Sequence, residues 1–285
     1  MPHTHFPQGL IDRLPTPKGV ALALTKACRS EDVSLEEIAA LVQTDPALSA
    51  RLLALANSAA SGGRTVLSAQ DAVARMGLVR VSQVALAFSL IDQHHEGACA
   101  NFDYAGFWNR SLLMAAAASE FGAPLGLGAS DHLFTVGLLA QIGRLALATA
   151  FPKDYSGLVA QEISAQELLQ REVAIAQINH VDLSVALMED WGIPIEYARP
   201  FGLHESSNVA LFKPQSIPHA RAILAHSCWQ VAAILSTDGV DALLGDPESL
   251  ATLQWLALDP EALAQRLAAI ESAWRIWLTL IARQG

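Results

Sequence analysis

Three histidines in the second half of the chain, His180, His204 and His226, are the side chains best suited to chemistry. Neutral imidazole nitrogens bind divalent transition metals, so these three would form a metal site if the fold brought them to one point. Arg110 carries a permanent positive charge, and with His180 and His204 it would instead form a small cationic pocket for an anion or a nucleotide phosphate. The structural alternative is that His180 and His204 are hydrogen-bonded side chains inside the protein.

Other reactive patterns are missing from the sequence. No serine stands in a GxSxG turn, and the adjacent pair His94-His95 lies in a polar stretch that fits a solvated linker better than a metal site. The three cysteines are far apart, without CxxC spacing, so we expect reduced, buried thiols. These cysteines are Cys28, Cys99 and Cys228.

The composition predicts a large helical core. Of the 285 residues, 52% are hydrophobic and only 16% are charged, and Leu and Ala dominate over aromatic and β-branched residues. The net charge of −10 opposes contact with nucleic acid and with anionic membrane surfaces. Arg144 interrupts the longest apolar run, and the first residues have no secretory signal pattern. We therefore expect an all-α protein in the cytoplasm, with no membrane or nucleic-acid partner.

Helix capping signals show how the chain is organised. Ser34 followed by Glu37 is a capping box, and Asp45-Pro46 starts another helix with a carboxylate cap and a proline in the first turn. The polar stretch 92–101 suggests a boundary between a small N-terminal helical subdomain, residues 1–100, and a second subdomain, residues 101–285. In the second subdomain we expect helices near residues 104–121, 131–150, 165–178, 180–191, 195–203 and 218–236.

The last helix carries an apolar stripe with alternating spacings of four and three residues. The stripe consists of Leu263, Leu267, Ile270, Trp274, Trp277 and Ile281. We expect it to pack against the rest of the chain. The alternative is a partner surface or a homodimer contact through this C-terminal helix, because a terminal helix with two Trp side chains is costly to leave exposed.

Three ordered stretches match one pattern. The first stretch contains LPTP at 14–17 and SLEEIA at 34–39. The second contains TDPALSARLLALANS at 44–58, followed by Gly62-Gly63 and MGLVRV at 76–81. The third contains FWNRS at 107–111, GLL and IGRL within 137–145, and HVD to WGIP within 180–194. Together they resemble the HDOD family, bacterial signalling modules related to the HD phosphohydrolases, over about residues 14–210. The resemblance implies a multi-helical fold with a small N-terminal subdomain and an HD-like subdomain.

The resemblance also implies a degenerate HD site. The first histidine of catalytic HD proteins corresponds to Arg110, the His-Asp doublet to Ala140 and Gln141, and the later aspartate falls near Trp229. A methyl group and a neutral amide cannot hold a divalent cation as imidazole and carboxylate do, and a guanidinium would repel one. The candidate residues of this pocket are Arg110, Ala140, Gln141, His180 and His204.

We therefore expect a stand-alone HDOD module that is not an enzyme and that acts in bacterial signal transduction through protein–protein interaction. This hypothesis includes no catalytic residue, no metal and no cofactor. Two alternatives follow from the same residues. One is a nucleotide-sensing module that uses the degenerate pocket, and the other is a metal-dependent phosphohydrolase with His180, His204 and His226 as ligands.

Overall fold

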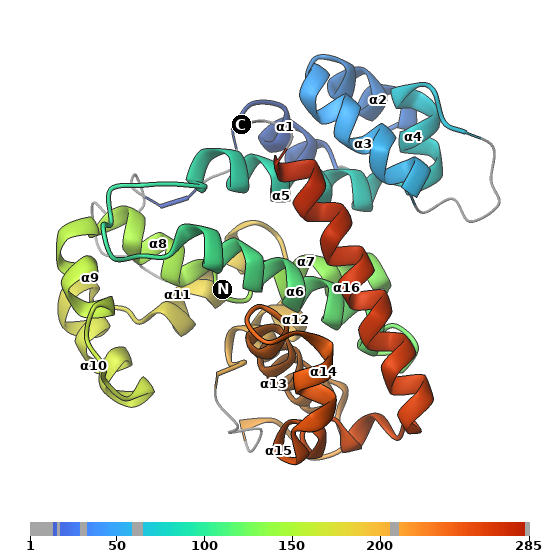
Figure 1. The fold of residues 1–285 in the computed structure, drawn as a ribbon. Helices are drawn as coiled ribbons and strands as arrows, with labels where there is room; N and C mark the ends of the chain where they lie inside the picture. The colour runs from blue at the N-terminus through green and yellow to red at the C-terminus, as the bar shows by residue number, and fades with distance from the viewer. Residues whose placement is uncertain (1–13, 16–17, 29–32, 59–64, 206–210, 283–285) are drawn as a thin grey trace. The chain divides into compact units, whose positions relative to one another are not determined.

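The computed structural model describes residues 14–15, 18–28, 33–58, 65–205 and 211–282 (Figure 1). Every regular element within these ranges is a helix, as the composition predicts. The described residues form two compact units: the large unit comprises Leu14, Pro15 and residues 94–275, and the small unit comprises the described residues of 16–93 together with 276–282.

The described residues form sixteen α-helices and one 3-10 turn, named here in chain order. In the small unit they are α1 (Gly19–Ala27), α2 (Leu35–Gln43), α3 (Pro46–Ser58), α4 (Ala69–Met76) and α5 (Leu78–His94). They continue with α6 (Tyr104–Gly122), α7 (Ser130–Leu139), α8 (Ile142–Ala150), α9 (Pro152–Val159), α10 (Ala165–Ala176), α11 (His180–Asp190), α12 (Ile195–Gly202), α13 (Ile217–Leu235), α14 (Gly239–Gly245), α15 (Pro247–Ala251), a 3-10 turn (Gln254–Leu256) and α16 (Pro260–Ala282).

Local side-chain caps start the helices of the small unit where the sequence predicts them. The backbone N–H of Glu37 donates to Ser34 Oγ at 3.1 Å, and the backbone N–H of Ser34 donates to Glu37 Oε2 at 2.9 Å, which confirms the capping box. Asp45 Oδ1 accepts from the backbone N–H of Leu48 at 3.0 Å and caps α3. These helices bury an apolar core that includes Leu24, Ile38, Val42, Leu52 and Val73.

Small residues allow the central helices of the large unit to approach closely. The helix α6 packs against both α7 and α13. At the contact with α7, a Cβ atom added to Gly137 would lie 2.8 Å from the Cα atom of Ala115, which is closer than real Cβ contacts come. The alanines that follow Ala115 on α6 are also buried. The sequence therefore uses glycine and alanine here to bring two backbones together.

The helix predicted over residues 131–150 is instead two helices, α7 and α8, which break at Ala140 and Gln141. The break has a physical cause in Gly143, whose backbone N–H donates to Ser184 Oγ at 2.8 Å instead of continuing α7. The carbonyl oxygen of His180 lies only 2.0 Å from where a Gly143 Cβ would be, so α11 holds the start of α8. The sequence prediction also missed α9, which begins directly after α8 with Pro152 in its first turn.

The span Ser130–Ala150 is long and apolar enough to cross a membrane, but 83% of its most apolar stretch is buried inside the protein. Burial of this kind is typical of a core helix. The neighbouring helices α7 and α8 contribute Leu133, Val136, Leu139, Ile142, Leu145 and Ala146 to the interior.

The apolar stripe of α16 packs inside the protein, as expected. Leu263, Leu267 and Ile270 belong to the core of the large unit, and the indole N–H of Trp274 donates to Asn109 Oδ1 at 2.7 Å. From residue 276 onward the helix belongs to the small unit, where the ring of Trp277 lies 5.1 Å from that of Phe88. The side chain of Ile281 lies outside the described residues.

Candidate functional site

An internal carboxylate, Glu205, lies at the centre of the polar residues of the large unit. Arg144 Nη2 donates to Glu205 Oε1 at 2.6 Å. The other carboxylate oxygen, Oε2, lies 3.3 Å from His180 Nε2, an ion-pair distance that does not meet hydrogen-bond geometry. His204 Nε2 lies 3.7 Å from Glu205 Oε1. One carboxylate therefore faces a guanidinium and two imidazoles.

A second carboxylate, Glu172 from α10, holds the opposite side of the His180 ring. Glu172 Oε2 lies 2.7 Å from His180 Nδ1 and also accepts the backbone N–H of His180 at 2.9 Å. The hydroxyl of Tyr155 from α9 donates to Glu172 Oε1 at 3.1 Å. Glu172 and His180 are both completely buried, so neither group is hydrated and each depends on its partners within the protein.

The first turn of α11 places His180 between these carboxylates. Asn179 caps the helix, since its Oδ1 accepts from the backbone N–H of Asp182 at 2.8 Å. Ser184 donates to the carbonyl of His180 at 2.8 Å and accepts from Gly143, which joins α11 to the start of α8. Arg144 follows Gly143 directly in the chain, so the contact between Gly143 and Ser184 also fixes the backbone from which the Arg144 side chain reaches Glu205.

The pKa values of Glu205, His180 and Arg144 are shifted by burial and by their contacts with one another. Burial opposes ionisation of Glu205, but the two histidines and Arg144 lower its pKa far below the usual range. Burial alone would lower the pKa of His180, yet the adjacent carboxylates Glu172 and Glu205 raise it overall. Burial also acts against Arg144, whose pKa is nevertheless raised, first of all by Glu205. The guanidinium of Arg144 and the ring of His180 thus both lie against carboxylates, Arg144 against Glu205 and His180 between Glu172 and Glu205.

Tyr155 stays neutral in this network. Burial raises its pKa well above the usual value, and the neighbouring carboxylate of Glu172 raises it further. A neutral hydroxyl can donate to a carboxylate, which is the role that the 3.1 Å distance to Glu172 indicates.

His204 and His226 are tied to the backbone. His204 Nδ1 lies 2.8 Å from the carbonyl oxygen of Phe201, and His226 Nδ1 lies 2.9 Å from the carbonyl oxygen of His204. The ring of Trp229 lies 6.2 Å from that of His204 and 5.8 Å from that of His226. An aromatic side chain therefore stands at the position that the resemblance matched to a metal-binding aspartate.

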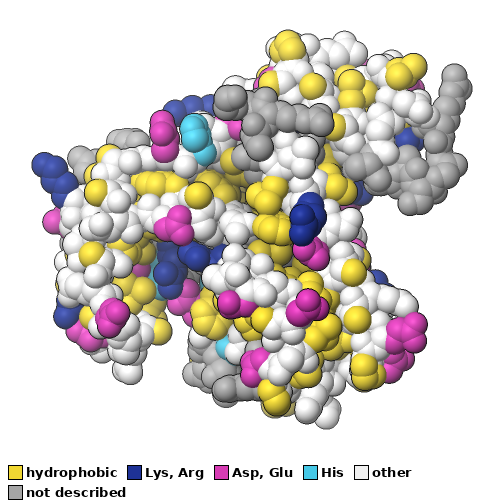
Figure 2. All heavy atoms as spheres, viewed as in Figure 1, with side chains coloured by type: hydrophobic (Ala, Val, Ile, Leu, Met, Phe, Trp, Pro, Cys, Tyr) yellow, Lys and Arg dark blue, Asp and Glu magenta, His cyan; other side chains and the backbone are white. Residues whose placement is uncertain are grey.

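The remaining predicted residues lie around the network without joining it. Arg110 is partly buried and has no hydrogen bond or ion pair with the described residues. Burial lowers its pKa, the charge of Asp103 opposes this effect, and the charge of Arg144 adds to it. Ala140 is buried in the apolar core. Gln141 is 5% exposed, and its Nε2 has no hydrogen-bond partner within the described ranges. Figure 2 shows basic side chains in a recess of the large unit between α9–α10 and α12–α13, with acidic and histidine side chains beside them.

The arrangement does not fit a metal centre. Among the residues that the structure describes, no three His, Cys, Asp or Glu side chains are grouped as metal ligands. His180 and His204 are brought together, but by Glu205, whose carboxylate is already paired with Arg144. The thiol of Cys228 lies in the apolar core, where burial raises its pKa well above the usual value and keeps it uncharged.

Four residues of the network, Arg144, Tyr155, Glu172 and Glu205, were not predicted as site residues. Two of them had a signal in the sequence: Glu205 follows His204 directly, and Arg144 lies in a stretch that matches the family. Glu172 had none, because a glutamate between Arg171 and Val173 on an amphipathic helix reads as a solvated side chain.

Comparisons with known proteins found similar solved structures. A crystal structure of the MmoQ response regulator from Methylococcus capsulatus str. Bath is 35% identical in sequence, covers 90% of this chain and 99% of its own, and has a TM-score of 0.58. An HDOD domain protein with unknown function from Geobacter sulfurreducens shares the fold, with 20% identity, coverage of 94% and 91%, and a TM-score of 0.63.

A curated relative, an uncharacterized protein of Treponema pallidum (strain Nichols), is 25% identical over 200 residues. The match covers 65% of this chain and only 36% of that protein. The family model of the HDOD domain matches residues 14–207, which include both the capped helices of the small unit and the network around Glu205. The chain therefore belongs to the HDOD domain family.

Proposed function

We propose that this protein is a non-enzymatic signal-transduction module of the bacterial cytoplasm that acts by binding another protein. Membership of the HDOD family and the similarity to a response regulator support a role in signalling. The observation that carries the non-enzymatic part is the position of Glu205. Its carboxylate is paired with Arg144 and faces His180 and His204, so these side chains are engaged with one another and are not open metal ligands.

The charged network around Glu205 fits a structural role. A buried ion pair gains little net stability over an apolar core, because the desolvation of both charges offsets their attraction. Hydrogen bonds hold both oxygens of Glu172, and each oxygen of Glu205 lies within ion-pair distance of a cationic or imidazole nitrogen. The network fits a rigid framework that fixes α8, α10 and α11 and keeps the surface of the large unit in one shape.

The experiment has an enzymatic arm and a binding arm. Protein purified without an affinity tag is analysed for bound metal and assayed with a phosphomonoester and a phosphodiester in the presence of added Mn²⁺. We expect substoichiometric metal and no turnover. Turnover that is lost in a His180→Gln, His204→Gln variant would refute the non-enzymatic proposal and favour the phosphohydrolase alternative.

For the binding arm, a tagged copy is recovered from its native host, the proteins that come with it are identified, and each is purified. We expect one of them to bind the pure chain directly in a calorimetric titration. If no candidate binds in purified form, the protein–protein proposal fails. A homodimer is the alternative contact, and light scattering of the pure chain across a range of concentrations tests it. The stripe residues Leu263, Leu267 and Ile270 lie in the core of their own chain, which counts against a dimer through this stripe.

Nucleotide sensing is a second candidate because Arg110 is a partly buried cation without a hydrogen bond or ion pair among the described residues. A phosphate would satisfy it with charge-assisted hydrogen bonds. Bound nucleotide should raise the melting temperature, and Arg110→Ala should abolish that shift. The exposed Arg199 gives a matched control, since Arg199→Ala removes the same charge elsewhere on the large unit. Equal shifts in both variants, or no shift with any nucleotide, would reject this candidate.

A further inference from the structure

The helix α10 is attached to the large unit with little apolar burial. It lies beside α9 at one edge of that unit (Figure 1), and α9 is its main packing partner. Along α10, all of which the structure describes, only the side chains of Glu172 and Ala176 are buried. Its larger apolar side chains all keep contact with solvent: Leu168, Leu169, Val173 and Ile175. Burial of an apolar face supplies most of the stability of a helix in a protein, so α10 lacks most of this contribution.

A polar contact holds α10 in place instead. The side chain of Glu172 accepts hydrogen bonds from the Tyr155 hydroxyl at 3.1 Å and from the backbone N–H of His180 at 2.9 Å, and its Oε2 lies 2.7 Å from His180 Nδ1. A buried carboxyl group has given up its hydration for such partners. Opening the contact returns this group to water, which offsets much of the lost hydrogen bonding. The contact therefore fixes the position of α10 precisely but contributes only a small net free energy.

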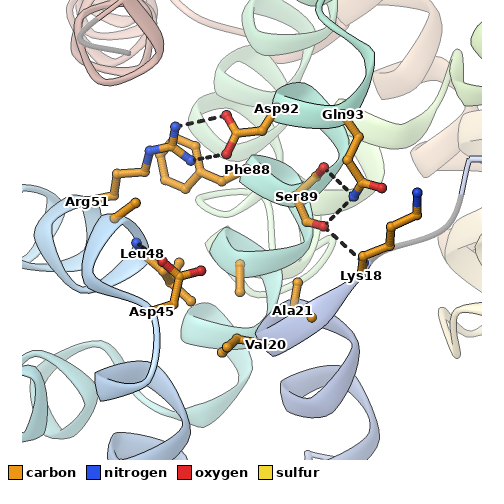
Figure 3. A pocket seen from close by; sticks show the side chains of 13 residues that line it. Lys18, Val20, Ala21, Asp45, Leu48, Arg51, Phe88, Ser89, Asp92 and Gln93 are labelled. Atoms are coloured by element: carbon orange, nitrogen blue, oxygen red, sulfur yellow. Dashed lines mark hydrogen bonds and ion pairs between the residues drawn. The ribbon is translucent and has the colours of Figure 1, made fainter.

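An ion pair in the small unit shows the opposite case. Arg51 of α3 donates two hydrogen bonds to Asp92 of α5, at 2.7 and 2.9 Å, beside a cavity of about 280 Å³ (Figure 3). The same helix α3 also buries Leu48, Leu52 and Leu55, so its ion pair adds to an apolar attachment. The polar contact of α10 has no comparable apolar support, and α10 depends on it to a greater degree.

Both ends of α10 lead into exposed chain. At its C-terminal end the exposed Gln177 has a φ of 62°, in the left-handed region that residues other than glycine adopt at a cost. Before its N-terminal end, Ala160, Gln161 and Glu162 are exposed. Arg171 donates to Gln161 Oε1, but an exposed contact of this kind adds little stability. The connections therefore allow α10 to move.

The helices on either side of α10 have apolar attachments of their own. The preceding helix α9 packs on α8 and buries Tyr155 and Leu158. The following helix α11 also packs on α8 and buries Leu183, Leu187 and Met188. Neither attachment needs α10, so α8, α9 and α11 can keep their places when α10 leaves.

We propose that α10 is a strap that detaches from the large unit while the helices around it stay folded, and that the side chain of Glu172 is its latch. With the latch closed, the large unit keeps the single surface described above. With the latch open, Tyr155 and His180 lose their cover, and α10 presents apolar side chains such as Leu168 and Ile175. A partner that binds one of these two surfaces shifts the population toward it. This regulation rests on the proposed function in protein binding, whereas the strap itself is tested without a partner.

Native-state hydrogen exchange of the full chain in low concentrations of urea measures how readily each helix opens. We expect the amides of α10 to exchange together, through an opening that exposes little surface and therefore hardly depends on urea. The amides of α8 and α11 should exchange at least about tenfold more slowly relative to their unfolded rates. If α10 is protected as strongly as α8 and α11, the strap proposal is wrong.

Two variants and a matched control identify the latch. Glu172→Gln keeps the size of the side chain but replaces one oxygen with an NH2 group, so the Tyr155 hydroxyl or His180 loses its acceptor. It should speed exchange in α10 by about tenfold or more, and Tyr155→Phe, which removes one hydrogen bond, should act in the same direction by a smaller factor. Glu167→Gln makes the same change on the same helix, where the side chain pairs only with Arg171, and should have no effect. The latch assignment fails if Glu167→Gln acts as strongly as Glu172→Gln, if neither latch variant speeds exchange, or if exchange rises equally in α6 and α13.

Discussion

Replacing Glu205 with glutamine should destabilise the large unit because the substitution leaves Arg144 and His180 without their shared counter-ion. The guanidinium of Arg144 lies 2.6 Å from the carboxylate, and the carboxylate is only 11% exposed. Removing one partner of a buried pair costs about 3–5 kcal/mol. Since Arg144 keeps 28% exposure and can regain some water, we expect a loss of about 3 kcal/mol.

Urea unfolding at pH 6 measures this loss through tryptophan fluorescence, because Trp229 lies beside His204 in the same unit. The melting temperature should fall by about 6–12 °C. The double variant Arg144→Met, Glu205→Gln should recover at least about 1 kcal/mol relative to the sum of the single variants, since it removes both charges. A loss below about 1 kcal/mol for Glu205→Gln, or strictly additive effects, would refute the view that Glu205 neutralises this pocket.

Three further outcomes are expected. The pKa of His180 is raised in the folded protein, so its contribution to stability is complete below about pH 6.5 and is lost as pH rises through the native pKa. Urea unfolding measured between pH 6 and 9 should show this loss as a slope of up to about 1.4 kcal/mol per pH unit. The His180→Gln variant should not show this slope. Gly143→Ala places a Cβ 2.0 Å from the carbonyl oxygen of His180 and should cost about 3 kcal/mol in a thermal melt or prevent folding. Gly157→Ala is the control: its Cβ meets nothing within 4 Å, so it should be neutral or slightly stabilising in the same measurement. Ser34→Ala should cost about 1 kcal/mol in urea unfolding by breaking the capping box, and no change would mean that α2 does not depend on its cap.

The sequence predicts the helices of the small unit well because their signals are local. A cap such as Ser34 or Asp45 acts within one turn, so its residue type and spacing are sufficient to locate a helix start. The end of α3 depends on a contact farther along the chain: the side-chain amide of Asn57 accepts from the N–H of Val66 at 2.8 Å and donates to its carbonyl at 2.9 Å. That partner could not be named from the sequence, because it lies beyond the end of α3.

The break between α7 and α8 and the network around Glu205 could not be predicted for the same physical reason. Residues 131–150 have continuous helical periodicity, and the interruption comes from a contact between Gly143 and α11, which lies some forty residues later. His180 and His204, two of the candidate residues named from the sequence, both lie beside Glu205. Their shared carboxylate was missed, because burial of an acidic side chain is decided by tertiary packing and not by its neighbours in sequence.

The division of α16 between the two units has a consequence for folding during synthesis. Trp277 completes the small unit by packing on Phe88, yet roughly 180 residues separate the end of α5 from this part of α16. At about 5–20 residues per second, the ribosome needs on the order of 10–40 s to make that length. The helices α1–α5 therefore wait, with part of their apolar surface uncovered, until α16 has been made. We expect chaperones that hold nascent chains to contact residues 18–93 during this interval, and not after α16 has been released.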